Sequence, residues 1–159
     1  LSALKYGVCL TRLIIETHPD LQAFRGSVTG VLRWHQLDEL WNRVLASESG
    51  WYVYAVGEEP PRECLSPATL QTVVNQLDTL LHRDHPEDYC GIVYTDDIIE
   101  PSYIKIFDPH NLGSTCGSSS GPPLPGWIFS KIQPITLPKA VPQPLNRRHW
   151  WQKLLTHGY

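Results

Sequence analysis

The stretch CGIVYTDDIIEPSYIKIFD, residues 90–108, decides the fold of this chain. Two runs rich in β-branched and aromatic side chains, 90–96 and 102–108, flank a short turn from Asp97 to Pro101. Side chains of this kind favour strands, and a short turn joins strands that run antiparallel to each other. The stretch therefore predicts an antiparallel hairpin.

Other strands are expected on both sides of the hairpin. The run WYVYAVG (51–57) has the strongest strand character in the chain, and WIFSKI (127–132) predicts a short strand. Near the amino terminus, YGVCLTRLII (6–15) also favours a strand. The residues that follow it, up to Gly30, show no clear period and are expected to be irregular.

Two segments carry the 3.6-residue apolar period of an amphipathic helix. The first stripe consists of Leu37, Leu40, Trp41, Val44 and Leu45. The second consists of Leu70, Val73, Val74, Leu77, Leu80 and Leu81. Ser66-Pro67 predicts the start of the second helix, because serine caps free backbone N–H groups and proline suits the first helical position. This helix should end before Pro86.

These elements predict an α+β fold with an antiparallel or mixed sheet of four to five strands and two main helices on one face. Residues 1–133 are expected to form a single domain. Residues 134–159 read as an extended Pro-rich linker with an aromatic C-terminal segment, packed on the domain or on a partner. The final residues, RRHWWQKLLTHGY, favour a short helix.

Composition excludes several functional classes. Of 159 residues, 42% are hydrophobic and 18% are charged, which is typical of a folded globular protein and not of a disordered one. A formal net charge of −3 argues against a nucleic-acid partner. No run approaches the roughly 20 apolar residues of a membrane span, and no secretory leader is recognised. Four widely spaced cysteines indicate free thiols, and hence a cytoplasmic protein.

The most unusual local chemistry lies between Asp108 and Gly126, in a loop rich in glycine and serine. Glycine-rich loops bind phosphate where they lead into a helix. Here the prolines at 122, 123 and 125 follow the glycines, and no Lys-Ser or Lys-Thr pair is present, so a phosphate loop and a dinucleotide fingerprint are excluded. Successive N–H groups could still form an anion nest. No cofactor is expected.

The same loop contains a candidate thiol site. Cys116 has His110 six positions earlier and Asp108 before it, so a catalytic Cys–His–Asp set is one hypothesis. His82, His85 or His149 could also reach the thiol in the fold. The plainer alternative is that Cys116 is a small turn or core residue.

A candidate metal site lies at His82 and His85, three positions apart near a predicted helix end, with Asp88 and Cys90 following. The alternative is favourable interaction of the imidazoles with the carboxyl end of the helix. The acidic pairs Glu58-Glu59 and Asp96-Asp97 could act as acids, bases or cation ligands, but they more simply mark turns.

Aromatic and cationic residues near the carboxyl end suggest a binding surface, because such residues are enriched at protein interfaces. The candidates are Trp127, Arg148, Trp150 and Trp151. They could pack on their own domain or on a neighbour. The leading hypothesis is a small accessory or protein-interaction domain without catalysis, with another protein or a second copy as its partner and neither nucleic acid nor membrane. The alternative is a thiol-dependent enzyme or redox protein, and metal binding is third.

Overall fold

The fold is built on a five-stranded sheet in which every neighbouring pair of strands is antiparallel. The computed structural model describes residues 19–112, 124–136 and 143–157. The strands are β1 (Thr29–Val31), β2 (Tyr52–Ala55), β3 (Val93–Thr95), β4 (Tyr103–Ile106) and β5 (Trp127–Ser130), in the spatial order β1-β3-β4-β5-β2. The predicted α+β class and sheet size are confirmed, and β3 and β4 form the predicted hairpin.

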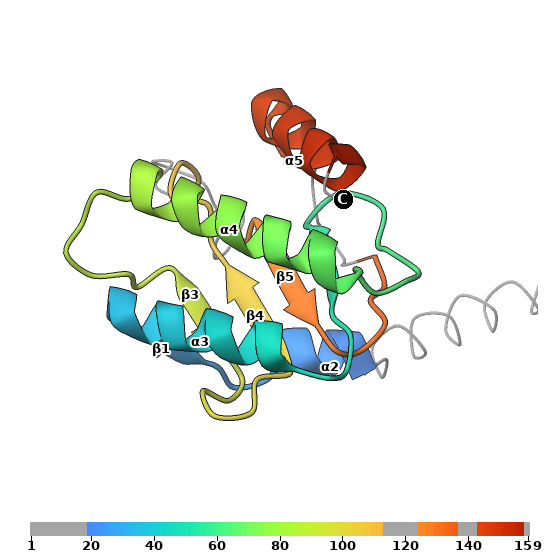
Figure 1. Cartoon of the computed structure of the whole chain (residues 1–159), viewed down its shortest axis with the longest axis horizontal. Coiled ribbons are helices and arrows are strands. Elements are labelled where there is room, and N and C mark those ends of the chain that lie inside the picture. The colour runs from blue at the N-terminus through green and yellow to red at the C-terminus, as the bar shows by residue number, and fades with distance from the viewer. Residues whose placement is uncertain (1–18, 113–123, 137–142, 158–159) are drawn as a thin grey trace, which may run out of the picture.

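Two long helices, α3 (Trp34–Ala46) and α4 (Pro67–Asp84), lie side by side across one face of the sheet (Figure 1). The predicted apolar stripes are the buried faces of these helices. Ser66 caps α4 as expected, because its Oγ accepts the Thr69 N–H at 3.2 Å and Pro67 occupies the first helical position. The main core fills the space between these helices and the sheet, where the aromatic side chains of Trp51, Trp127 and Phe129 are fully buried.

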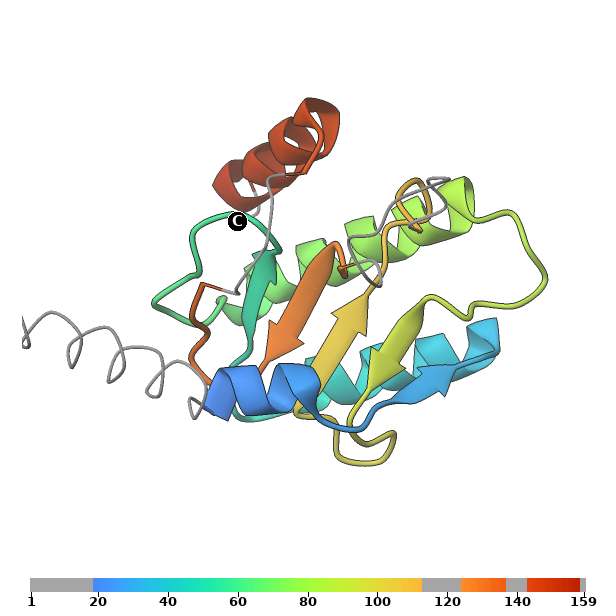
Figure 2. The same cartoon turned by 180° about the vertical axis from the view of Figure 1, so that it is seen from behind.

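The opposite face of the sheet carries a smaller apolar cluster. Figure 2 shows α2 (Pro19–Arg25) lying across one end of this face. Phe24 of α2 packs against a cluster whose buried members are Tyr54, Val56, Tyr103 and Ile128. Side chains of successive strand residues point to opposite faces, so Ile128 belongs to this cluster while Trp127 and Phe129 belong to the main core.

The expectation of irregular structure up to Gly30 was wrong in part, because α2 and β1 both form there. β1 is only three residues long and gains its order by pairing with β3, with Gly30 opposite Tyr94. A Cβ at Gly30 would lie 3.2 Å from the Tyr94 ring, so the glycine lets this ring lie close to the edge strand. The strand predicted for residues 6–15 lies outside the described residues.

The carboxyl-terminal helix predicted from Arg147 onward is α5 (Leu145–His157), which lies beyond one end of the sheet (Figure 1). Trp151 of α5 is buried in the main core. Residues 137–142 of the expected Pro-rich arm lie outside the described residues. Within the described ranges, no helix combines the length and the apolar character needed to cross a membrane.

Candidate functional site

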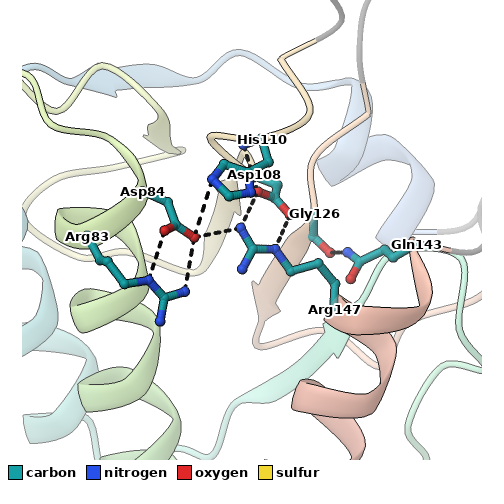
Figure 3. A network of polar contacts seen from close by, with 7 residues as sticks. All are labelled: Arg83, Asp84, Asp108, His110, Gly126, Gln143 and Arg147. Carbon is teal, nitrogen blue, oxygen red and sulfur yellow. Dashed lines mark hydrogen bonds and ion pairs between the residues drawn. The ribbon is translucent and has the colours of Figure 1, made fainter.

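A network of charged side chains joins the carboxyl end of α4, the segment after β4 and the first turn of α5 (Figure 3). Arg147 is at its centre and donates from Nε and Nη2 to the two carboxylate oxygens of Asp108, at 2.8 and 3.0 Å. The same Nη2 donates to Asp84 Oδ2 at 2.8 Å. The side chains of Arg147, Asp108 and Asp84 are only 7, 7 and 10% exposed, so these three charged groups are almost entirely withdrawn from water.

Asp84 is held in its charged form by two guanidinium groups. Arg83 donates to its two carboxylate oxygens at 2.8 and 3.0 Å, and Arg147 supplies the third bond. The hydrogen bonds from Arg83, followed by those from Arg147, hold the pKa of Asp84 far below its usual range despite its burial. Burial works to lower the pKa of Arg147, but its bonds to Asp108 and Asp84 outweigh this and raise it. Asp84 therefore cannot act as a proton donor at neutral pH.

Asp108 also organises the turn that follows β4. Its Oδ1 accepts the His110 N–H at 2.9 Å, and its backbone carbonyl accepts the Asn111 N–H at 2.9 Å. Both carboxylate oxygens are thus already engaged by hydrogen-bond donors. Through these bonds Asp108 stabilises the turn that follows β4.

Of the three residues in the thiol hypothesis, the structure describes Asp108 and His110. Asp108 and His110 are neighbours, but the bond between them runs through the His110 backbone. The imidazole is 60% exposed, and its Nε2 lies 3.7 Å from Asp84 Oδ2. Cys116 lies outside the described residues, so its role stays a prediction. Sequence reasoning missed Asp84 and Arg147, whose partners lie far away in the chain.

The two candidate metal ligands are placed against aromatic residues. His82 stacks on Trp34 with ring centroids 4.0 Å apart, and its Nε2 lies 3.5 Å from Asp78 Oδ1. The ring of His85 makes edge contacts with Trp34 and Tyr89. Among the residues with described positions, no group of three or more His, Cys, Asp or Glu side chains could hold a metal ion. The described residues therefore give the metal hypothesis no support.

The candidate binding residues of the carboxyl-terminal region pack largely on their own domain. Trp127 and Trp151 are buried in the core, and Trp150 meets Trp127 edge to face with centroids 5.8 Å apart. Arg148 Nε donates to Glu58 Oε1 at 2.8 Å. Of the two alternatives, docking of this segment on its own domain is the one that the structure displays. Only Trp150 and Arg148 of these four are partly exposed.

The acidic pair Asp96-Asp97 marks a turn. Asp96 Oδ1 accepts the backbone N–H groups of Ser102 and Tyr103, each at 3.0 Å. Asp97 Oδ1 accepts those of Ile99 and Glu100, at 2.8 and 3.1 Å. These bonds tie the loop between β3 and β4 to its own side chains. Acid–base work by this pair has no geometric support.

An apolar groove of about 300 Å³ is lined in part by Tyr94 and Lys105. Their strand neighbours Val93 and Ile106 lie in the main core under α3 and α4, so the groove is on the opposite face of the sheet. Its lining residues are Val28, Gly91, Ile92, Tyr94, Lys105, Phe107 and Leu112. The rings of Tyr94 and Phe107 meet edge to face at 5.6 Å. Gly91 has φ +67°, a conformation that favours glycine, and a Cβ there would lie 3.1 Å from the Tyr89 ring. Tyr89 therefore stands at the rim of the groove.

Among the described residues that line the groove, Lys105 is the one cation. Its Nζ donates to the Phe24 carbonyl and lies 4.5 Å from the centre of the Phe24 ring. Burial lowers the pKa of Lys105, because desolvation disfavours an ammonium ion. The ion pairs found among the described residues do not include Lys105.

The network and the groove thus differ in what they can do. The network has its charges paired internally and serves to fix α5. The groove leaves apolar side chains and a partly desolvated cation open to a ligand. Comparison of the chain with models of protein families, with curated proteins and with solved structures gave no match.

Proposed function

We propose that this chain is a protein-interaction domain without catalysis of its own. In this proposal it docks a partner segment that combines apolar side chains with a carboxylate, and the segment lies in the groove of Tyr94, Lys105, Phe107 and Leu112. One observation carries the proposal. Exposed apolar side chains gather around a groove that contains a cation, whereas the carboxylates of the buried network are bound to arginines.

The rim of the groove supports the apolar part of the proposal. Leu112 is 42% exposed and lines the groove, and Tyr89 is 51% exposed beside Gly91. Leu32 is 62% exposed, and its Cδ2 lies 3.9 Å from the position of a Gly30 Cβ, next to the Tyr94 ring. Single exposed apolar residues are ordinary, but a contiguous set around a groove is typical of an interaction site.

The environment of Lys105 supports the presence of a carboxylate in the partner segment. A cation that has lost water without gaining a carboxylate is less stable in its charged form. A partner carboxylate near Nζ would restore that stability and raise the pKa of Lys105. A wholly apolar partner would instead bury the ammonium further. The charge of the groove therefore favours a segment that contains Asp or Glu.

The placement of the groove supports tight recognition. Tyr94 lies in β3 and Lys105 in β4, and these strands are paired with Tyr94 opposite Lys105. Side chains held on a sheet lose little freedom when a partner binds, so less of the binding energy is spent on ordering them. The groove is thus a preformed surface.

Selection from a random peptide library displayed on phage tests the proposal. Peptides selected on the wild-type protein should combine apolar residues with Asp or Glu. Leu112→Asp should weaken a selected peptide by about tenfold or more, because it places a carboxylate among the apolar side chains that the peptide would cover. The matched control is Leu155→Asp on α5, where the parent leucine is similarly exposed, and it should leave affinity unchanged.

A double-mutant cycle then tests the role of Lys105. Lys105→Met keeps the apolar stem and removes the charge. It should weaken an acidic peptide but not the same peptide with Asp replaced by Asn, because the coupling exists only between the two charges. If the selected peptides show no acidic preference and bind Leu112→Asp as well as the wild type, the proposal is wrong.

A further inference from the structure

A second pocket, of about 510 Å³, lies between the carboxyl end of α3, the loop joining β3 to β4, and the residue that follows β5. It is lined by Arg43, Ala46, Ser47, Ile99, Glu100, Pro101, Ser102 and Lys131. None of these residues belongs to the groove or to the buried network. The pocket falls within the size range of small-molecule sites.

Lys131 is anchored in this pocket by neutral groups. Its Nζ donates to Ser47 Oγ at 2.6 Å and to Ser49 Oγ at 2.7 Å, and it lies 5.0 Å from the centre of the Trp51 ring. Its backbone N–H donates to the Ser102 carbonyl at 3.0 Å, which fixes the residue against the loop. An ammonium group has three protons, so one remains for a ligand after these two bonds.

Arg43 supplies a second cation. It lies in the last turn of α3, and its Nη1 donates to the Ile99 carbonyl at 3.1 Å. A guanidinium has five N–H donors, so most of them remain for a ligand. The ion pairs of the described residues include neither Arg43 nor Lys131. Two cations with neutral partners therefore line one pocket.

We propose that this pocket binds a small phosphate monoester that carries hydroxyl groups. A phosphate monoester has a charge between about −1.5 and −2 at neutral pH and three strong acceptor oxygens. This charge and these acceptors are complementary to two cations that still have N–H groups available for a ligand. The volume exceeds the space that a phosphate group needs. Ala46, Ile99 and Pro101 provide apolar surface for the organic part.

Glu100 determines which organic part fits. Glu100 lines the same pocket and its negative charge repels an anion, as does the carboxyl end of α3. A ligand hydroxyl can donate to this carboxylate and offset the repulsion. The pocket should therefore bind glycerol 3-phosphate more tightly than inorganic phosphate, and glycerol not at all.

Titration followed by amide resonances in NMR tests this inference, with glycerol 3-phosphate, inorganic phosphate and glycerol as probes at constant ionic strength and pH 7.5. The amides of Ser47, Ser102 and Lys131 should shift and saturate with glycerol 3-phosphate. Arg43→Gln and Lys131→Met should each weaken binding at least fivefold. Two controls remove exposed cations elsewhere, Arg62→Gln and Lys153→Met, and should bind as the wild type does.

The direction in which Glu100→Gln changes the affinity for each probe gives an independent check. Glu100→Gln should tighten inorganic phosphate, since it removes a like charge, and should reduce the preference for glycerol 3-phosphate. Shifts that do not saturate, that glycerol reproduces, or that are the same in Arg43→Gln overturn the inference. Circular dichroism shows whether Lys131→Met remains folded. If that variant is unfolded, the affinity of Arg43→Gln tests the inference on its own. Failure here leaves the groove proposal untouched, because the two sites share no residue.

Discussion

Arg147 and Asp108 are 39 positions apart in the chain and form a buried two-bond ion pair, at 2.8 and 3.0 Å. The pair joins the first turn of α5 to the segment that follows β4. Burying two charges is unfavourable unless each meets its partner, so loss of either residue leaves the other uncompensated. The position of α5 therefore depends on a polar contact as well as on the packing of Trp151.

Replacing Arg147 with Met should lower the free energy of unfolding by about 3 to 5 kcal/mol, because Asp108 is then buried without a counterion. The neighbouring Arg148 gives a matched control, since its bond to Glu58 is partly exposed. Arg148→Met should cost less than about 1 kcal/mol. Urea unfolding followed by tryptophan fluorescence measures both. Equal losses in the two variants would show that burial does not set the strength of these pairs.

The free energy of unfolding should depend on pH through Asp84. Its pKa is lowered in the folded protein by Arg83 and Arg147, while in the unfolded chain it returns to about 3.9. The folded state therefore gains stability from Asp84 above pH 4 and loses it progressively as the pH falls below that value. Asp84→Asn should show a smaller fall between about pH 5 and pH 2. Asp38→Asn, on the exposed side of α3, should keep the wild-type fall.

The two described cysteines should differ sharply in reactivity. Cys64 is exposed, whereas Cys90 is buried and its burial raises the pKa of the thiol. Because the thiolate is the reactive form, iodoacetamide at pH 7 should label Cys64 in the native protein and Cys90 only after unfolding. Mass spectrometry of the digested protein reports each site. Native labelling of Cys90 at the rate of Cys64 would contradict the packing around it.

The same experiment decides the thiol hypothesis for Cys116. A nucleophilic thiol should react much faster at pH 7 than a model thiol with a pKa of about 8.5. The enzyme hypothesis thus expects Cys116 to label faster than Cys64, and His110→Ala to slow it. Labelling at or below the rate of Cys64 excludes the hypothesis that Cys116 is a nucleophile.

Local pattern was sufficient for most of the fold. Alternation in residues 90–108 predicted the hairpin, and the stripes from Leu37 and Leu70 predicted α3 and α4 because each depends on neighbours within a turn. β1 was missed because it is only three residues long and has Gly30 at its centre, where a glycine weakens the strand pattern. Its order comes from β3, more than sixty residues later in the chain. α2 is a single short helix of seven residues with no strong apolar period.

The charged network could not be predicted in the same way. Asp108 was singled out for the loop that it begins, but its partner Arg147 was not among the candidate residues. Nothing in the local sequence pairs either residue with the other or with Asp84, since ion pairs across 39 and 63 positions follow from the assembled fold. Trp127 shows the same limit, because an aromatic residue suited to an interface is equally suited to a core.

The order β1-β3-β4-β5-β2 has a consequence for how the chain folds during synthesis. β2 precedes β5 by more than seventy residues, yet β5 is its one neighbour among the strands that the structure describes, and Tyr52 pairs with Ser130. Until Ser130 has been made, β2 lacks its partner β5 and Trp51 lacks Phe129 to pack against. Long-range pairing of this kind is slow to form, so the apolar β2 is without β5 for as long as the residues between the two strands are being made.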